Sequence, residues 1–144
     1  MKKLISLIGA LAIALSVSTA ALAKTPTVYV DGQKIEFDAQ PFIENDRTLV
    51  PMRAIFEAMG ANVAWDQTTL TVFALKPVTE TENDIVTIQI GNPKAFVNST
   101  EILLDVPAKV VSDRTFVPLR FIGESLNATV DWDPDTFNVT ITSK

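Results

Sequence analysis

The stretch DRTLVPMR at residues 46–53 returns as DRTFVPLR at residues 113–120, 67 residues later in the chain. These two copies contain all four arginines of the protein, and every other basic residue is a lysine. An arginine carries a planar, permanently charged group with a fixed fork of donors, so its restriction to one motif indicates a geometric role performed twice. The motif therefore predicts a duplicated chain.

The similarity between the two copies extends well beyond the motif. A shift of 67 aligns residues 28–74 with residues 95–141 without a gap, and it places Trp65 and Trp132 at one aligned position. Similarity at a fixed period indicates that one supersecondary unit was copied, and such a unit buries its apolar face against its neighbour. We expect two repeats that share one core within a single domain, residues 24–144.

The first 23 residues have the organisation of a secretory signal peptide. Lys2 and Lys3 precede an apolar stretch over residues 4–17, and ALA at residues 21–23 has the small residues of a cleavage site. The apolar stretch is short for a membrane span of about 20 residues. We predict cleavage before Lys24 and a secreted chain without a stable membrane span; an uncleaved membrane anchor is the alternative.

The composition excludes several classes of function. The chain has a net charge of −5 and contains neither cysteine nor histidine. An acidic chain lacks the positive charge that nucleic-acid binders concentrate. Without imidazole or thiolate, a copper site, a histidine-dependent triad and a cysteine nucleophile have no ligands or catalytic groups. We therefore predict no cofactor and no catalytic activity, and stability that comes from packing rather than disulfides.

Alternating apolar residues and turn signals predict a chain made mostly of antiparallel strands. Asp31-Gly32 is a hairpin signal, and DPD at residues 133–135 is typical of a turn. Residues 80–84 are expected to form an exposed loop, and residues 84–90 an exposed edge strand that can pair with another copy. The expected strands cover residues 27–30, 34–37, 62–65, 70–73, 84–90, 95–97, 101–104, 129–132 and 137–141.

Helical spacing follows each copy of the motif. Apolar residues recur on one helical face after Pro51 and again after Pro118, and proline suits the first turn of a helix. Gly60 and Asn127 suit the left-handed residue that ends a helix, so each helix should have about nine or ten residues. The sequence thus predicts an α+β domain in which hairpin, helix and hairpin occur twice, with two short helices packed on the strands.

These motifs resemble the copper amine oxidase N-terminal domain-like family, also called the stalk domain, over roughly residues 28–142. The resemblance rests on the two Arg-Thr-x-Val-Pro-x-Arg stretches, on the Val-x-Trp-Asp that follows each helix, and on the helix ends at residues 57–61 and 124–128. It implies an extracellular module of secreted and wall-associated bacterial proteins, appended to an oxidase rather than the oxidase itself. Asn127 departs from the glycine expected there.

Arg47, Arg53, Arg114 and Arg120 are candidate site residues with two interpretations. They can bind an anion such as a wall phosphate or an acidic sugar, helped by the adjacent helix start. They can equally pair within the domain, which we favour because internal partners are available. The expected pairs are Arg53 with Glu57, Arg120 with Glu124, and Arg47 and Arg114 with Asp38, Asp105 or backbone carbonyls.

Trp65 and Trp132 are the aromatic candidates. Either can stack on a sugar ring, but a tryptophan at a repeated strand position is more often core, and the alternation places Val63 and Trp65 on one sheet face. Asp131, Asp133 and Asp135 alternate through the last turn and raise the alternative of a calcium site. Carboxylates in turns are common, however, and this loop lacks the glycine of a helix-loop-helix calcium site.

The sequence therefore favours a secreted, non-catalytic structural or binding module of the bacterial cell envelope. Its partner would be a cell-wall polymer or an envelope protein. One alternative is an inhibitor or accessory subunit of a secreted enzyme, favoured if an exposed apolar patch surrounds the loop at Glu80. A small extracellular hydrolase or amine-processing enzyme is the least favoured, because Glu57 and Glu124 have arginines one helical turn away.

Overall fold

The computed structural model describes residues 25–144, and the predicted signal peptide lies outside the described residues. Within this described range, 51% of the residues form strands, which are mostly antiparallel, and there are two short helices, which confirms the predicted α+β class. None of the helices in this part of the chain has the length and apolar character to cross a bilayer.

The elements follow one another along the chain with short connections. The helices are α2 (Met52–Ala58) and α3 (Leu119–Leu126). The strands are β1 (Thr27–Val30), β2 (Gln33–Lys34), β3 (Phe42–Glu44), β4 (Arg47–Pro51), β5 (Asn62–Asp66), β6 (Thr71–Pro77), β7 (Asn83–Gln89), β8 (Lys94–Val97), β9 (Thr100–Leu103), β10 (Lys109–Val111), β11 (Arg114–Pro118), β12 (Ala128–Asp133) and β13 (Asn138–Ser143).

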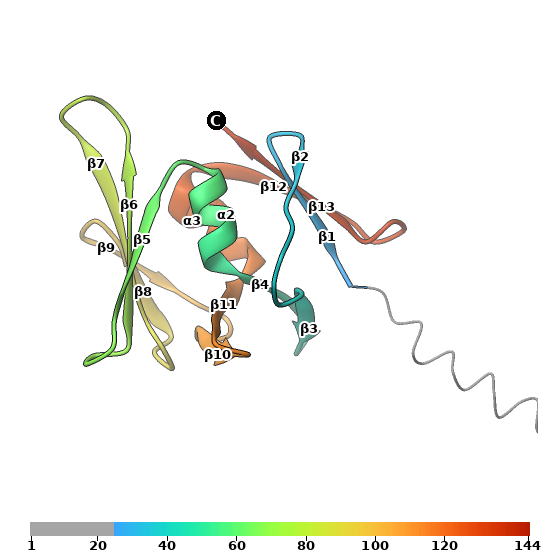
Figure 1. Cartoon of the computed structure of the whole chain (residues 1–144), viewed down its shortest axis with the longest axis horizontal. Helices are drawn as coiled ribbons and strands as arrows, with labels where there is room; N and C mark the ends of the chain where they lie inside the picture. The colour runs from blue at the N-terminus through green and yellow to red at the C-terminus, as the bar shows by residue number, and fades with distance from the viewer. Residues whose placement is uncertain (1–24) are drawn as a thin grey trace, which may run out of the picture.

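The strands form three sheets, which we call A, B and C. Sheet A has the order β12-β13-β1-β2, sheet B the order β10-β11-β4-β3, and sheet C the order β5-β6-β7-β8-β9. Sheets A and C flank the two helices, and sheet B closes one end of the space between them (Figure 1). The helices are thus held between two sheets, as short helices require.

Strands from the two halves of the chain combine in each sheet. In sheet A, β1 from the first half pairs with β13 from the second in parallel, at Val28 with Val139. In sheet C, β7 lies between β6 of the first half and β8 of the second, and pairs antiparallel with both. The expectation of an exposed edge strand at residues 84–90 is therefore wrong, because both edges of β7 are hydrogen-bonded.

Each helix begins directly after a strand, without a loop. Pro51 and Pro118 are the N-cap residues with extended backbone, and α2 and α3 have seven and eight residues, slightly fewer than predicted. Gly60 and Asn127 both have positive φ, at 92° and 54°, as expected for residues that end a helix. The proline and the left-handed residue together limit each helix to about two turns.

Sheet B contains two hairpins that the sequence analysis missed. The tight turns Asn45-Asp46 and Ser112-Asp113 have positive φ at both residues, the conformation of a type I′ hairpin turn. Neither turn has the glycine that usually announces such a hairpin, so the four short strands were not expected. In the centre of the sheet β4 and β11 pair antiparallel, with Val50 opposite Val117.

One large core joins the whole domain. It contains the inner faces of sheets A and C together with the buried faces of both helices, including Val28, Phe56, Val86, Ile122 and Ile141, each at most 1% exposed. A smaller cluster around Leu49 and Phe116 lies at sheet B. The large core thus contains residues from both halves of the chain.

Candidate functional site

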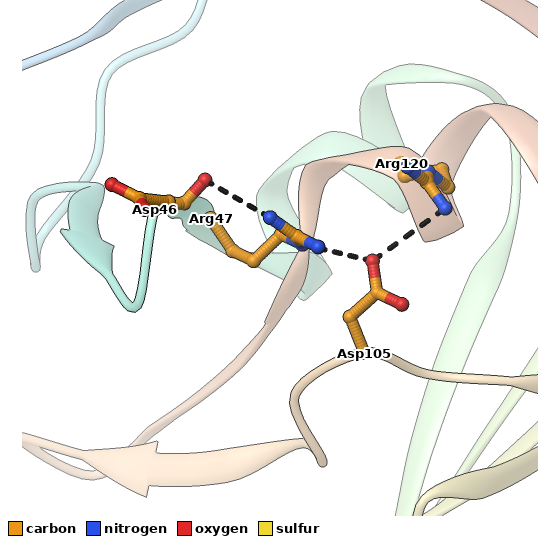
Figure 2. Close-up of polar contacts among 4 residues, drawn as sticks. All are labelled: Asp46, Arg47, Asp105 and Arg120. Carbon is orange, nitrogen blue, oxygen red and sulfur yellow. Dashed lines mark hydrogen bonds and ion pairs between the residues drawn. The ribbon is translucent and has the colours of Figure 1, made fainter.

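Asp105 joins two arginines from different copies of the motif (Figure 2). Arg47 on β4 donates from Nε to the Asp105 Oδ2 at 2.9 Å, and Arg120 on α3 lies with Nη1 at 3.5 Å from the same oxygen. Arg47 also donates to the carbonyl oxygen of Asp46. The Asp105 carboxylate, which lies between β9 and β10, thus connects the first residue of β4 to the first turn of α3.

The other two arginines also have partners within the domain. Arg114 donates from Nη2 to the Oδ2 of Asp38 at 2.7 Å. Arg53 donates to the carbonyl oxygen of Val63 at 3.1 Å and to Glu57 at 3.4 Å. The predicted pairs of Arg47, Arg53 and Arg114 are confirmed.

The predicted pair between Arg120 and Glu124 does not form, and Arg120 turns to Asp105 instead. Asp105 lies 15 residues earlier in the chain, and the packing of sheet B against α3 brings it to the helix start. Asp105 lies 67 positions after Asp38, just as Arg114 lies 67 after Arg47. The pairs Arg47–Asp105 and Arg114–Asp38 are therefore reciprocal across the two halves.

A cleft of about 810 Å³, which we call the Trp65 cleft, opens between α2, β5 and the hairpin β10–β11. Its wall is partly apolar and partly charged, as in many small-ligand sites. The Trp65 Nε1 donates to the Gln67 Oε1 at 2.9 Å, which fixes the indole ring at the rim. The charged lining residues are Glu36, Asp38, Arg53, Glu57, Asp113 and Arg114, and the apolar ones include Phe37, Val63, Leu70, Val72 and Ile90.

Both tryptophans are more exposed than the sequence suggested. Trp65 is 38% exposed and Trp132 is 37% exposed, so the expectation that they belong to the core is wrong. Trp65 does start from the inner face of sheet C, opposite the buried Val72. Helix α2 has only seven residues, however, and it leaves the indole at the open cleft rather than covering it.

The two tryptophans differ in their surroundings. The ring of Trp132 packs edge-on against Phe137, with centroids 5.1 Å apart, and it lines neither the Trp65 cleft nor the second pocket described below. Leu70 stands where the shift of 67 places Phe137, and an aliphatic side chain there cannot repeat the ring pair. The ring of Trp65 therefore faces a cavity, whereas the ring of Trp132 packs against a neighbouring phenylalanine.

A second pocket, of about 710 Å³, lies between α3 and the ends of β7 and β8. Arg120, Glu124, Asp84 and Lys144 are among its lining residues. Gly123 keeps this part of the helix thin, because a Cβ atom there would lie 3.1 Å from both the Ala128 carbonyl oxygen and a methyl group of Val130. Ser125, which also lines the pocket, is 2% exposed and its hydroxyl has no hydrogen-bond partner.

Two further aspartates accept hydrogen bonds within the domain. Asp31 accepts from the backbone N–H of Ser143 at 2.8 Å and from its hydroxyl at 2.7 Å, and these bonds lower the pKa of the Asp31 carboxyl. Asp133 accepts from the backbone N–H of Asp135, as in an ordinary turn. Among residues 25–144 no three acidic side chains converge in the geometry of a metal site.

The tryptophan and the arginines of the cleft were predicted from the sequence, whereas much of the cleft wall was not. Phe37, Ile90 and Val110 come from three segments that are distant in sequence from α2. Their apolar character was visible, but nothing local indicates that they meet. The turn residues Ser112 and Asp113 were the available signal for the hairpin that closes the cleft.

The fold and the cleft define a small, strand-rich α+β module with a cleft of mixed apolar and charged lining. Residues 29–141 match the family model described as copper amine oxidase N-terminal domain, so the chain belongs to that family. This membership suggests a non-catalytic accessory module. A search of curated proteins found no match to the chain.

Proposed function

We propose that this protein is a secreted, non-catalytic binding module of the bacterial cell envelope, and that the Trp65 cleft holds a glycan segment of a wall polymer. The observation that carries the proposal is the half-exposed indole ring of Trp65 at the rim of an 810 Å³ cleft. A flat aromatic ring offers apolar contact to the face of a sugar, while its N–H remains hydrogen-bonded.

The charged groups of the cleft support a binding role. Arg53 is bonded to Glu57 and Val63, and Arg114 is bonded to Asp38, so their side chains are already ordered before a ligand arrives. Ordered groups lose little entropy on binding, which favours affinity. Because each arginine has a carboxylate partner, the cleft offers donors and acceptors together, which suits hydroxyl-rich ligands better than a strongly anionic one.

We also propose that the module consists of two repeats, residues 28–74 and 95–141, related by an approximate two-fold axis through sheet B. The pairing of Val50 with Val117 supports this proposal, because those residues are 67 positions apart and their neighbours pair reciprocally. The reciprocal ion pairs of Arg47 and Arg114 agree with it. Residues 1–23 would direct secretion, and the N-terminal residue of protein recovered from culture medium tests that step.

The cleft is tested by sedimentation with purified insoluble peptidoglycan. We expect Trp65→Ala to weaken binding about tenfold, or about 1.4 kcal/mol, because the ring loses its contact with the sugar. Trp132→Ala is the matched control, since it removes an equally exposed tryptophan that does not line the cleft. In the Trp132→Phe variant, Trp65 is the sole tryptophan, and its fluorescence should change when soluble wall fragments are added. Equal binding by both alanine variants, or no binding by the wild type, contradicts the proposal.

A further inference from the structure

The outer face of sheet C carries an apolar patch, which we call the sheet C patch and define as Phe73, Leu75, Ile85, Phe96 and Leu103. Cross-strand register places Phe73, Thr87 and Phe96 in one row, because residues that pair directly point to the same side of a sheet. Leu75 and Ile85 form the adjacent row. The first four members are between 38% and 44% exposed and Leu103 is 66% exposed.

Sheet A provides an internal comparison for this patch. Phe73 pairs with Ala64 on β5, and the residue 67 positions later, Thr140, pairs with Asp131 on β12 in the same register. At the other positions, Leu75 corresponds to Thr142 and Phe96 to Tyr29. The corresponding face of sheet A is therefore largely polar. The fold itself does not require apolar residues at these positions. The apolar character of the sheet C patch therefore needs an explanation other than folding.

The size of the patch indicates the kind of surface that covers it. Its side chains expose roughly 400 Å² of apolar area, which is at the level of the largest patches on single soluble domains. A standard interface buries about 800 Å² per partner, of which about 65% is apolar in homodimers. The patch thus supplies most of the apolar core that one side of a homodimer needs.

The charges on this face favour a second copy over a different partner. Lys94 lies opposite Leu103 and Glu101 lies opposite Phe96, and Asp66 on β5 points to the same face, so charges of both signs border the patch. An interface between two identical surfaces needs such self-complementarity.

We propose that a second copy of this chain packs on the sheet C patch, face to face about a two-fold axis. Two sheets stacked in this way keep their inner strands in place and bury their apolar rows between them. Trp65 and Val72 belong to the opposite, inner face of sheet C, so both Trp65 clefts stay open in the dimer. The dimer is therefore a bivalent module, and two clefts on one polymer strengthen binding through effective concentration.

The oligomeric state tests the proposal directly. In analytical ultracentrifugation at about 100 µM we expect the wild type to be a dimer, and Phe73→Thr with Leu75→Thr to associate at least about 100-fold more weakly, because two central apolar contacts are lost. These substitutions install the residues that sheet A carries at the same register. The control is Thr140→Ser with Thr142→Ser, which alters sheet A and should leave the dimer intact.

Circular dichroism and thermal unfolding establish that each variant is folded. If the double variant does not fold, Ile85→Lys places a charge within the patch and should also yield a monomer. A wild type that remains monomeric at about 100 µM overturns the proposal, as does a folded double variant that dimerises like the wild type. A wild-type monomer that captures another secreted protein through this face also overturns it, in favour of an accessory-subunit role.

Discussion

Removal of the Asp105 charge tests whether the reciprocal ion pairs stabilise the domain. Asp105→Asn keeps the size of the side chain and one oxygen that can accept from Arg47, so it removes little besides the charge. Asp38→Asn makes the corresponding change in the pair with Arg114. The two variants differ in exposure, because the Asp105 side chain is 35% exposed and that of Asp38 is 79% exposed.

The expected magnitudes follow from this difference. Asp105 faces Arg47 at 2.9 Å and Arg120 at 3.5 Å, whereas Asp38 faces one arginine at 2.7 Å. Exposed pairs contribute about 0.2–1 kcal/mol, with networks at the upper end. We expect Asp105→Asn to lower the free energy of unfolding by about 1 kcal/mol, and Asp38→Asn to lower it by about 0.3 kcal/mol.

Urea unfolding at pH 7, followed by tryptophan fluorescence, measures both changes. In about 1 M NaCl the screening length falls to about 3 Å, so the effect of Asp105→Asn should shrink to less than half. A loss for Asp38→Asn that equals or exceeds the loss for Asp105→Asn would refute the argument from burial. An Asp105→Asn effect that does not change with salt would show that the charge is not its cause.

Two further changes test single groups. Ser125→Ala should raise the free energy of unfolding by about 1.5 kcal/mol and the melting temperature by about 6 °C, because it removes a buried hydroxyl without a partner and improves helix propensity. Ser99→Ala, in an exposed turn, is the control. An unchanged or lower melting temperature for Ser125→Ala contradicts the conclusion that the Ser125 hydroxyl is buried without a partner. For Asp31, the bonds from Ser143 lower the folded-state pKa, so the stabilisation is present above the ordinary pKa near 4 and is lost as the pH falls through the lowered value. Asp31→Asn should therefore be less stable than the wild type in urea at pH 7, with a gap that closes towards about pH 2, and a gap that is constant with pH would count against this link.

Local patterns in the sequence predicted much of the fold. The period-two stretches and the Asp-Gly turn located most strands of sheets A and C, because alternation and turn chemistry depend on neighbouring residues alone. Pro51 and Gly60 bracketed α2 for the same reason. The arginine motif marked the start of the helix in both halves.

The candidate site was only partly visible in sequence. Asp38, Asp105 or backbone carbonyls were predicted as partners of Arg47 and Arg114, and the structure decided which aspartate meets which arginine, whereas Arg120 was assigned to Glu124 by helical spacing alone. Helical spacing places Glu124 one turn from Arg120. The packing of sheet B against α3 instead brings Asp105 beside Arg120, and that pair forms. Local geometry can propose partners, but it cannot rank one in the same helix against one from another element.

The sequence by itself determined the element types, the capped helix ends and the absence of imidazole and thiolate chemistry, since these follow from residue identity and short-range spacing. Only the tertiary structure decided that β7 is an inner strand, that Trp65 faces a cleft and that the outer face of sheet C is apolar where that of sheet A is polar. The physical reason is that strand neighbours and burial depend on contacts between residues far apart in the chain. The same alternating pattern is compatible with an edge or a centre, and with a covered or an open face, until the sheets assemble.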